Sequence, residues 1–314
     1  MYFPYLRARQ FELISLRELS AEPQFKSHVI PVLEPVRESV NGLILANKIF
    51  TENSFNPFLI VNPLQGEMAG ETNHFLDFIR DVEENCFRAA FHFTNNADYV
   101  LNSIVDYFLD DVMLICLEGY VDDATLRHLF ENPRISHVMV LDPQKNRQLD
   151  RHIKSLGKFY IRLDDVFDKR EKNADYLDIA AHKFTEEHIF YGEEGYDGFS
   201  DFTVLPGEFV DGGSTPRAVV IHLSYINEEV NNEIWVRHFT SNTNDSIANV
   251  QLKFAEAASK AIQFVTEQHL DNAAISELKN YFEAEKYPGL GTVKKISIKN
   301  HLIIVSDYLN SVGQ

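Results

Sequence analysis

The sequence has 314 residues, of which 45% are hydrophobic and 24% charged, a composition typical of a soluble globular protein. Aspartate and glutamate outnumber lysine and arginine by 47 to 29, and the formal net charge of −18 opposes binding to nucleic acid or to an anionic membrane. There is no signal-peptide pattern, no apolar run of ~18 residues and no CxxC pair, so we expect a cytoplasmic protein with free thiols and no membrane span.

The chain begins with a segment that has apolar residues at roughly helical spacing over 2–19. We therefore expect 1–28 to form a helical lead ahead of the first strand. Arg7, Arg9 and Glu12 lie in or just before its first turns. Because such a helix usually closes the amino-terminal end of the fold that follows, we expect these charges to form structural ion pairs there.

Eight short apolar runs follow, most of them separated by an amphipathic helical pattern. The runs are 30–33, 58–61, 88–91, 112–117, 138–141, 159–161, 202–205 and 219–221. Strands that are apolar along their whole length are buried on both faces, as in parallel sheets. Eight of them in alternation with helices predict an α/β fold, a closed (β/α)8 TIM-like barrel.

The C-terminal part has a different pattern. A further β-like run covers 234–239, and 246–268 has the apolar stripe of a long helix. We expect helices over 246–314, after a barrel core at 29–245. No stretch has the composition of a linker, so the sequence predicts a single domain over 1–314.

Several familiar reaction motifs are absent. The chain has no GxxxxGK[ST] loop, no GxGxxG turn after a strand, no GxSxG elbow and no HExxH helix. Gly212-Gly213-Ser214-Thr215 could cradle a phosphate through backbone N–H groups. It leads into a predicted strand and not into a helix, which favours a tight loop.

Polar residues stand at the ends of the predicted strands, where TIM barrels carry their catalytic groups. Carboxylates there could bind a divalent cation, and a histidine could move a proton at neutral pH. The candidate catalytic residues are Glu34, Glu118, Asp201, His222 and His238, and the candidate ligand-binding residues are Asn62, His92, Asp142 and Arg162. The alternative is that these residues form turns and cap helices.

Two of these residues are expected to point into the barrel. Glu34 shares a strand face with apolar residues, and a buried carboxylate is costly unless it is paired. His222, Arg162 or Arg9 could supply that partner. An inward His222 could serve in a site, but its position favours a neutral buried histidine with a backbone partner.

Asp201, His222 and His238 come from adjacent predicted elements late in the chain. They could meet as a proton relay without metal or as a weak metal site. The sequence favours neither.

Several stretches together resemble a known family. They are Phe3-Pro4-Tyr5-Leu6-Arg7 with Gln10-Phe11-Glu12-Leu13, then 30–36, 173–176, 198–202, 218–223 and 238–239. In these stretches the chain is similar to the phage beta-protein family, a poorly characterised group of bacterial and phage-associated proteins. The resemblance implies a barrel-like α/β fold and an association with mobile elements or anti-phage loci. It implies no reaction.

Two functions fit these observations. The first is an accessory protein of a phage-defence or mobile-element locus that acts through a protein partner from that locus, and it predicts a barrel mouth filled by side chains. The second is a metal-assisted phosphodiester or nucleotide hydrolase. It predicts an open pocket at the carboxyl face where Glu34, Glu118, Asp201 and His222 approach one another. The metal, the substrate and the oligomeric state are left open.

Overall fold

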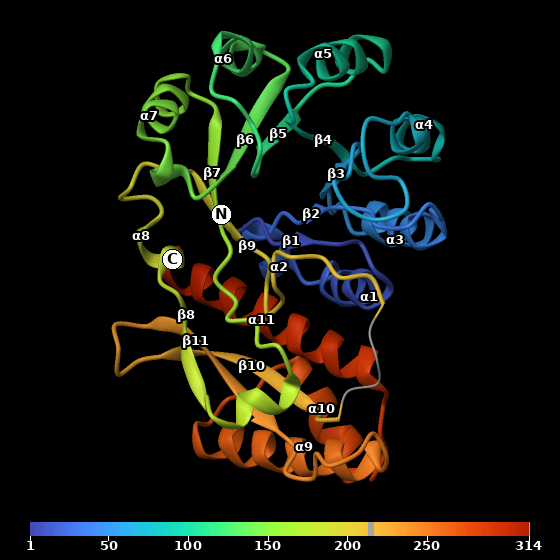
Figure 1. Ribbon diagram of the computed structural model, residues 1–314, viewed down its shortest axis with the longest axis vertical. Coiled ribbons are helices and arrows are strands. Elements are labelled where there is room, and N and C mark those ends of the chain that lie inside the picture. Colours follow the sequence, from blue (N-terminus) through green and yellow to red (C-terminus); the bar gives the residue numbers. More distant parts are fainter. Residues whose placement is uncertain (213–216, 314) are drawn as a thin grey trace. The chain divides into compact units, whose positions relative to one another are not determined.

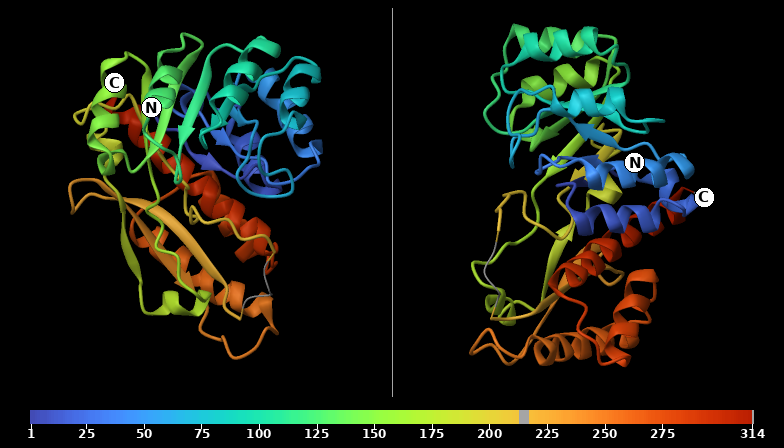
Figure 2. Two further views of the ribbon diagram at one scale, coloured as in Figure 1. Left: turned by 45° about the horizontal axis from the view of Figure 1, so that its top comes forward. Right: turned by 90° about the vertical axis from the view of Figure 1, so that its right-hand side faces the viewer.

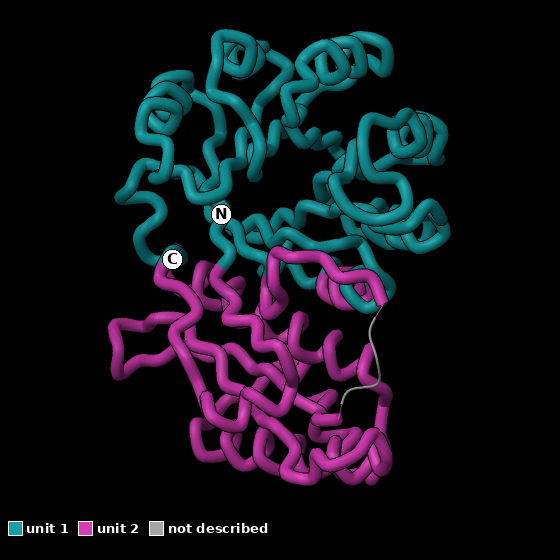
Figure 3. Tube along the Cα trace, viewed as in Figure 1, with its two compact units in different colours: residues 1–13, 20–165, 187–202 teal, residues 14–19, 166–186, 203–314 magenta. Residues whose placement is uncertain are grey.

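The computed structural model describes residues 1–212 and 217–313, and the described chain divides into two compact units (Figure 3). Unit 1 comprises 1–13, 20–165 and 187–202, and unit 2 comprises 14–19, 166–186 and 203–314. The two units are compact, but their compactness does not show that each folds independently. The single domain over 1–314 therefore stays a prediction. Residues 213–215 of the glycine-rich stretch lie outside the described residues.

Unit 1 is built on eight parallel strands in a nearly closed barrel (Figure 1). They are β1 (Tyr5–Leu6), β2 (Val32–Leu33), β3 (Phe58–Ile60), β4 (Arg88–His92), β5 (Val112–Cys116), β6 (Ile135–Leu141), β7 (Phe159–Asp164) and β9 (Gly198–Asp201), paired in that order. The backbone N–H of Phe3 donates to the carbonyl oxygen of Phe199 at 2.9 Å, and the N–H of Phe199 donates to Met1 at 3.1 Å. These bonds bring the last strand beside the first and confirm the predicted TIM-like fold.

Helices cover the outside of the strands in this unit (Figures 1 and 2). They are α2 (Pro23–His28), α3 (Asn41–Glu52), α4 (His74–Asp81), α5 (Ala97–Asp106), α6 (Ala124–Glu131), α7 (Arg147–Ser155) and α8 (Glu187–Phe190), with a 3₁₀ turn η1 (Pro143–Lys145); α1 (Gln10–Leu19) is divided between the units. Side-chain caps fix some of their starts. The Asp123 carboxylate accepts from the N–H groups of Thr125 and Leu126 at the start of α6, as expected for a capping aspartate.

The strands alternate between two environments. One set of side chains fills the barrel interior: Phe3, Tyr5, Val32, Phe58, Ile60, Ala90, Met113, Ile115, Met139, Ile161, Leu163 and Phe202. The residues between them point outward to the helices, because successive side chains of a strand face opposite ways. This alternation decides which polar residues can meet at the barrel mouth.

The structure corrects the limits of the barrel. Its first strand, β1, lies inside the segment predicted as a helical lead, and its last, β9, precedes the predicted strand 202–205. The run 219–221 overlaps a strand of unit 2 instead. The predicted core at 29–245 was therefore wrong at both ends, because β1 is only two residues long and β9 has no apolar run.

Among its described residues, unit 2 contains a three-stranded antiparallel sheet of order β10-β11-β8, several helices and the second part of α1. The elements are η2 (Asn173–Leu177), β8 (Ala181–Thr185), β10 (Val220–Asn227), β11 (Glu233–Thr240), α9 (Val250–Glu267), α10 (Ala273–Glu283) and α11 (Leu290–Val312). The predicted C-terminal helices are confirmed. Their buried faces form one apolar core with the sheet, which includes Ile221, Phe239, Phe254 and Ile296.

Two lysines of α11 are buried in an ion-pair cluster. Lys295 Nζ lies 2.9 Å from Glu18 and 2.8 Å from Glu277, and Lys299 Nζ lies 2.7 Å from Glu18. These cations therefore bind the helices of their own unit together and do not form an exposed basic surface. No helix of the described chain has the length and apolarity needed to cross a membrane.

We predict that Gly198→Ala destabilises the protein by about 1–3 kcal/mol, the usual cost of overpacking a core. A Cβ at Gly198 would lie 2.7 Å from Cε2 of the fully buried Phe3 and 3.1 Å from the Met1 carbonyl oxygen, at the seam that closes the barrel. Gly192→Ala is the matched control, since its Cβ would meet nothing within 4 Å. Denaturant unfolding measures both variants, and equal stability would contradict the tight seam.

Candidate functional site

A buried polar cluster occupies the carboxyl ends of β1 to β4, and we name it the mouth cluster: Tyr5, Arg7, Glu34, Asn62 and His92. The Arg7 guanidinium forms an ion pair with Glu34 Oε2. The Tyr5 hydroxyl donates to the same oxygen at 2.8 Å, and the N–H of Leu64 donates to Oε1 at 2.7 Å. Glu34 has no exposed surface, so both of its oxygens are used within the protein.

His92 extends this network. Its Nε2 lies 2.9 Å from the Tyr5 hydroxyl oxygen and 3.6 Å from Glu34 Oε1. Because the single Tyr5 proton is donated to Glu34, we assign the His92 proton to Nε2. Its Nδ1 has no hydrogen-bond partner among the described residues. Burial, and then the nearby Arg7 charge, lowers the pKa of His92 to about 3, so the ring is neutral.

Asn62 holds the His92 backbone. Its amide nitrogen donates to the His92 carbonyl oxygen at 2.8 Å, and its Oδ1 accepts from the His92 N–H at 2.9 Å. Arg7 also lies over two rings, with its guanidinium carbon 5.0 Å from the centre of the Tyr5 ring and 5.4 Å from that of Phe202. The cluster thus joins four strands and a loop through side chains that satisfy one another.

Arg162 belongs to a second buried network on the outer side of the strands. It forms two hydrogen bonds to Asp164, at 2.8 and 2.9 Å, and ion pairs with Glu187 at 2.6 Å and Glu194 at 2.8 Å. Its neighbours Ile161 and Leu163 belong to the interior, so Arg162 itself points toward the helices. It therefore does not pair with Glu34.

Asp201 also faces outward. It pairs in register with Asp164, and the Tyr2 hydroxyl donates to its Oδ1 at 2.7 Å. The next residue, Phe202, lies in the interior. Glu34 and Asp201 consequently lie on opposite sides of the strand layer.

The other two acidic candidates lie in turns. Glu118 is exposed in the loop after β5, and in the described chain it has no hydrogen bond or ion pair with the mouth cluster. Asp142 has a left-handed backbone, with φ 47°, ahead of η1, and its carboxylate pairs with Lys145 at 2.6 Å. This is the geometry of a turn-forming aspartate.

His222 and His238 lie in unit 2, where they form a row with His182. The first two are direct partners across β10 and β11, with 2.6 Å between their Nδ1 atoms, and His238 Nε2 lies 3.0 Å from His182 Nδ1. The Tyr176 ring packs on both, at 5.0 and 4.4 Å between ring centres. His222 and His238 therefore lie in contact as predicted, but they do so on an antiparallel sheet and not at a barrel mouth.

The histidine row is held in its neutral form. Burial first, and then the neighbouring imidazoles, lowers the pKa of His222 to about 3 and that of His238 to about 2. Across the described residues, no group of three or more His, Cys, Asp or Glu side chains has the geometry to hold a metal ion. The proton relay stays a prediction.

Sequence reasoning missed Tyr5 and His182. It expected Arg7 in a structural ion pair at the amino-terminal end of the fold, whereas Arg7 pairs with Glu34 at the carboxyl ends of the strands. Phe3, Tyr5 and Arg7 stand at every second position, which is the period of one strand face. This is the one local signal that could have placed Tyr5 and Arg7 on a strand. His182 joins the row through the pairing of β8 with β11, which no local pattern gives. Comparison with known proteins finds no family model, curated protein or solved structure that matches this chain.

We predict that the free energy of unfolding decreases as the pH is lowered below about 6.5 and that His92→Gln makes this decrease smaller. The pKa of His92 is about 3 in the folded protein and ~6.5 when unfolded, so the unfolded chain takes up the proton first as the pH falls. The folded state then loses about 1.4 kcal/mol per pH unit from this residue. Urea unfolding between pH 4.5 and 7.5 measures the slope.

His128→Gln is the control for this experiment, because the His128 side chain is 78% exposed on α6. The control should keep the parental slope. A parental slope in His92→Gln would show that His92 is not held neutral by burial.

Proposed function

We propose that this protein acts by binding a protein partner, as an accessory component of a phage-defence or mobile-element locus. The observation that supports this most is the state of Glu34, which is fully buried with both carboxylate oxygens occupied by donors of the same chain. This is the filled mouth that the partner-dependent function predicts.

The mouth cluster is poorly suited to catalysis. A substrate or metal ion that bound Glu34 would have to displace Arg7, and breaking a buried ion pair costs about 3–5 kcal/mol. A histidine with a pKa near 3 is also a weak base at neutral pH, where a general base works best with a pKa near the working pH. These features favour a structural role for the cluster.

The link to phage defence or mobile elements rests on the family resemblance. Two of the stretches that carry it, 3–7 and 30–36, supply Tyr5, Arg7 and Glu34 of the mouth cluster. The resemblance thus includes residues that hold the barrel together, as expected if the family shares a scaffold and not a reaction.

Metal-assisted hydrolysis of a phosphodiester or nucleotide is the competing function. Three of the four residues predicted to meet for it belong to unit 1, and there they lie apart: Glu34 is in the barrel interior, Asp201 is on the outer side of the strands, and Glu118 is exposed in a loop. Their dispersal weighs against a joint site.

We expect the protein to form a stoichiometric complex with a protein encoded beside its gene, in co-expression followed by size-exclusion chromatography. The purified protein alone should show no saturable rise in melting temperature with Mg²⁺, Mn²⁺, Zn²⁺ or nucleotides. The proposal fails if the purified protein hydrolyses a phosphodiester or nucleotide and folded His92→Gln loses that activity.

A further inference from the structure

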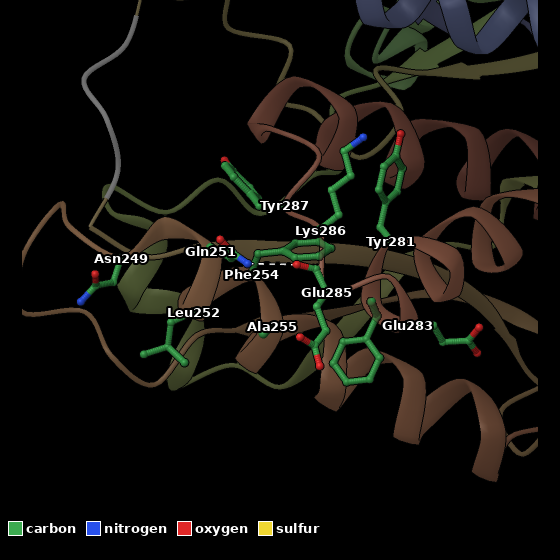
Figure 4. Close-up of a pocket in the computed structure, with 11 residues that line it drawn as sticks. Asn249, Gln251, Leu252, Phe254, Ala255, Tyr281, Glu283, Glu285, Lys286 and Tyr287 are labelled. Atoms are coloured by element: carbon green, nitrogen blue, oxygen red, sulfur yellow. Dashed lines mark hydrogen bonds between the residues drawn. The ribbon is translucent and has the colours of Figure 1, made fainter.

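A groove runs between the N-terminal half of α9 and the C-terminal end of α10, and we name it the hairpin groove (Figure 4). It has a volume of about 850 Å³ and is lined by residues within 249–255 and 281–287. All of them belong to unit 2. At this size the groove exceeds what one small side chain fills and lies in the range of ligand-binding clefts.

The floor of the groove is apolar and preformed. Phe254 is 2% exposed and packs on Tyr287, with 5.7 Å between ring centres. Phe282 is half-buried beside them, whereas Leu252 is 50% exposed. The Gln251 side-chain amide donates to the Glu285 carbonyl oxygen at 2.9 Å and so links α9 to the end of α10.

Charged groups surround this floor. Glu283, Glu285 and Lys286 are exposed, and their charged atoms form no hydrogen bond or ion pair with any described residue. Figure 4 shows the side chains of these three residues pointing in different directions. An apolar centre with a polar rim is the usual anatomy of a protein interface.

We propose that the hairpin groove binds an amphipathic helix of a protein partner, with the apolar face of that helix on Leu252 and Phe254 and basic residues beside Glu283 and Glu285. This inference rests on the proposed function and names the surface and the chemistry of the partner. Grooves between helices receive apolar side chains spaced i, i+3 or i+4 along a partner helix.

The charge of the partner follows from electrostatics. The three charged rim residues sum to −1, and the whole chain carries −18, so a basic helix is attracted and an acidic one repelled. The charged ends point in different directions and do not converge on one point of the groove, as the polar groups of a small-molecule site would.

The test uses a fluorescein-labelled helical peptide with leucines on one face and lysines on the other, and a second peptide with glutamate in place of each lysine. Fluorescence anisotropy should show saturable binding of the lysine peptide and at least about tenfold weaker binding of the glutamate peptide. Leu252→Glu should weaken the binding of the lysine peptide at least about tenfold, the size expected when an anchor contact is lost. Hydrogen exchange should slow in 249–256 and 281–287 on binding.

Leu45→Glu is the matched control. Leu45 lies on α3 with 49% of its surface exposed, against 50% for Leu252, and the substitution makes the same change in charge. Because both variants become more acidic, non-specific attraction of the lysine peptide should rise in both. If only Leu252→Glu weakens the binding of the lysine peptide, the peptide therefore binds in the hairpin groove.

The inference would be overturned if the lysine peptide did not bind, or if Leu252→Glu left its binding unchanged. Concentration-dependent dimers that Leu252→Glu abolishes would also overturn it, since the groove would then bind a second copy of this chain. A co-expressed complex that survives Leu252→Glu would also exclude the groove and leave the proposed function intact. Peptide binding in the groove with no complex from co-expression would support the surface and contradict the proposed accessory role.

Discussion

The buried ion pair between Arg7 and Glu34 is the constraint on which the barrel depends. β1 and β2 pair through only two residues each, so the backbone ladder between them is short. The ion pair continues the connection beyond the ladder, and the Tyr5 hydroxyl and the Leu64 N–H complete the coordination of the carboxylate. Without these donors a charge would be buried unpaired, which is among the most costly defects a fold can carry.

The same constraint explains the division of polar residues between two environments. Alternation along each strand places Glu34 and His92 inside the barrel and Arg162 outside it, so each buried arginine has its own carboxylates. The inner network joins strands to one another, and the outer one joins β7 to α8 and the loop that follows it. In both networks the buried arginine is paired with carboxylates of the same chain, whereas the charged groups around the hairpin groove form no hydrogen bond or ion pair with any described residue. This difference supports the proposed binding at the hairpin groove.

The sequence predicted the middle of the fold well because buried parallel strands are continuous apolar runs, and all six strands from β2 to β7 overlap such runs. β1 and β9 were missed for physical reasons. β1 has only two residues and adjoins a helical pattern that predicts a helix over the whole segment, whereas β9 is Gly-Phe-Ser-Asp and has no apolar run. The eighth predicted strand lies in an antiparallel sheet, which a local apolar run cannot distinguish from a barrel strand.

The candidate site was predicted in part for similar reasons. Glu34 and His92 follow recognisable strands, and parallel strands bring their carboxyl ends together, so placing them at one mouth needed only the strand positions. The partner of Glu34 was expected to be His222, Arg162 or Arg9 and is Arg7, because that pairing depends on the missed strand β1. The row formed by His182 with His222 and His238 depends in turn on long-range sheet pairing.

A double-mutant cycle on Arg7 and Glu34 tests this account most directly. Arg7→Met, Glu34→Gln and the double variant are compared with the parent by urea unfolding. The account predicts that each single variant loses about 3–5 kcal/mol, since each breaks the buried ion pair, and that the double variant loses well below the sum. Additive losses, or single variants as stable as the parent, would contradict a barrel held together by this pair.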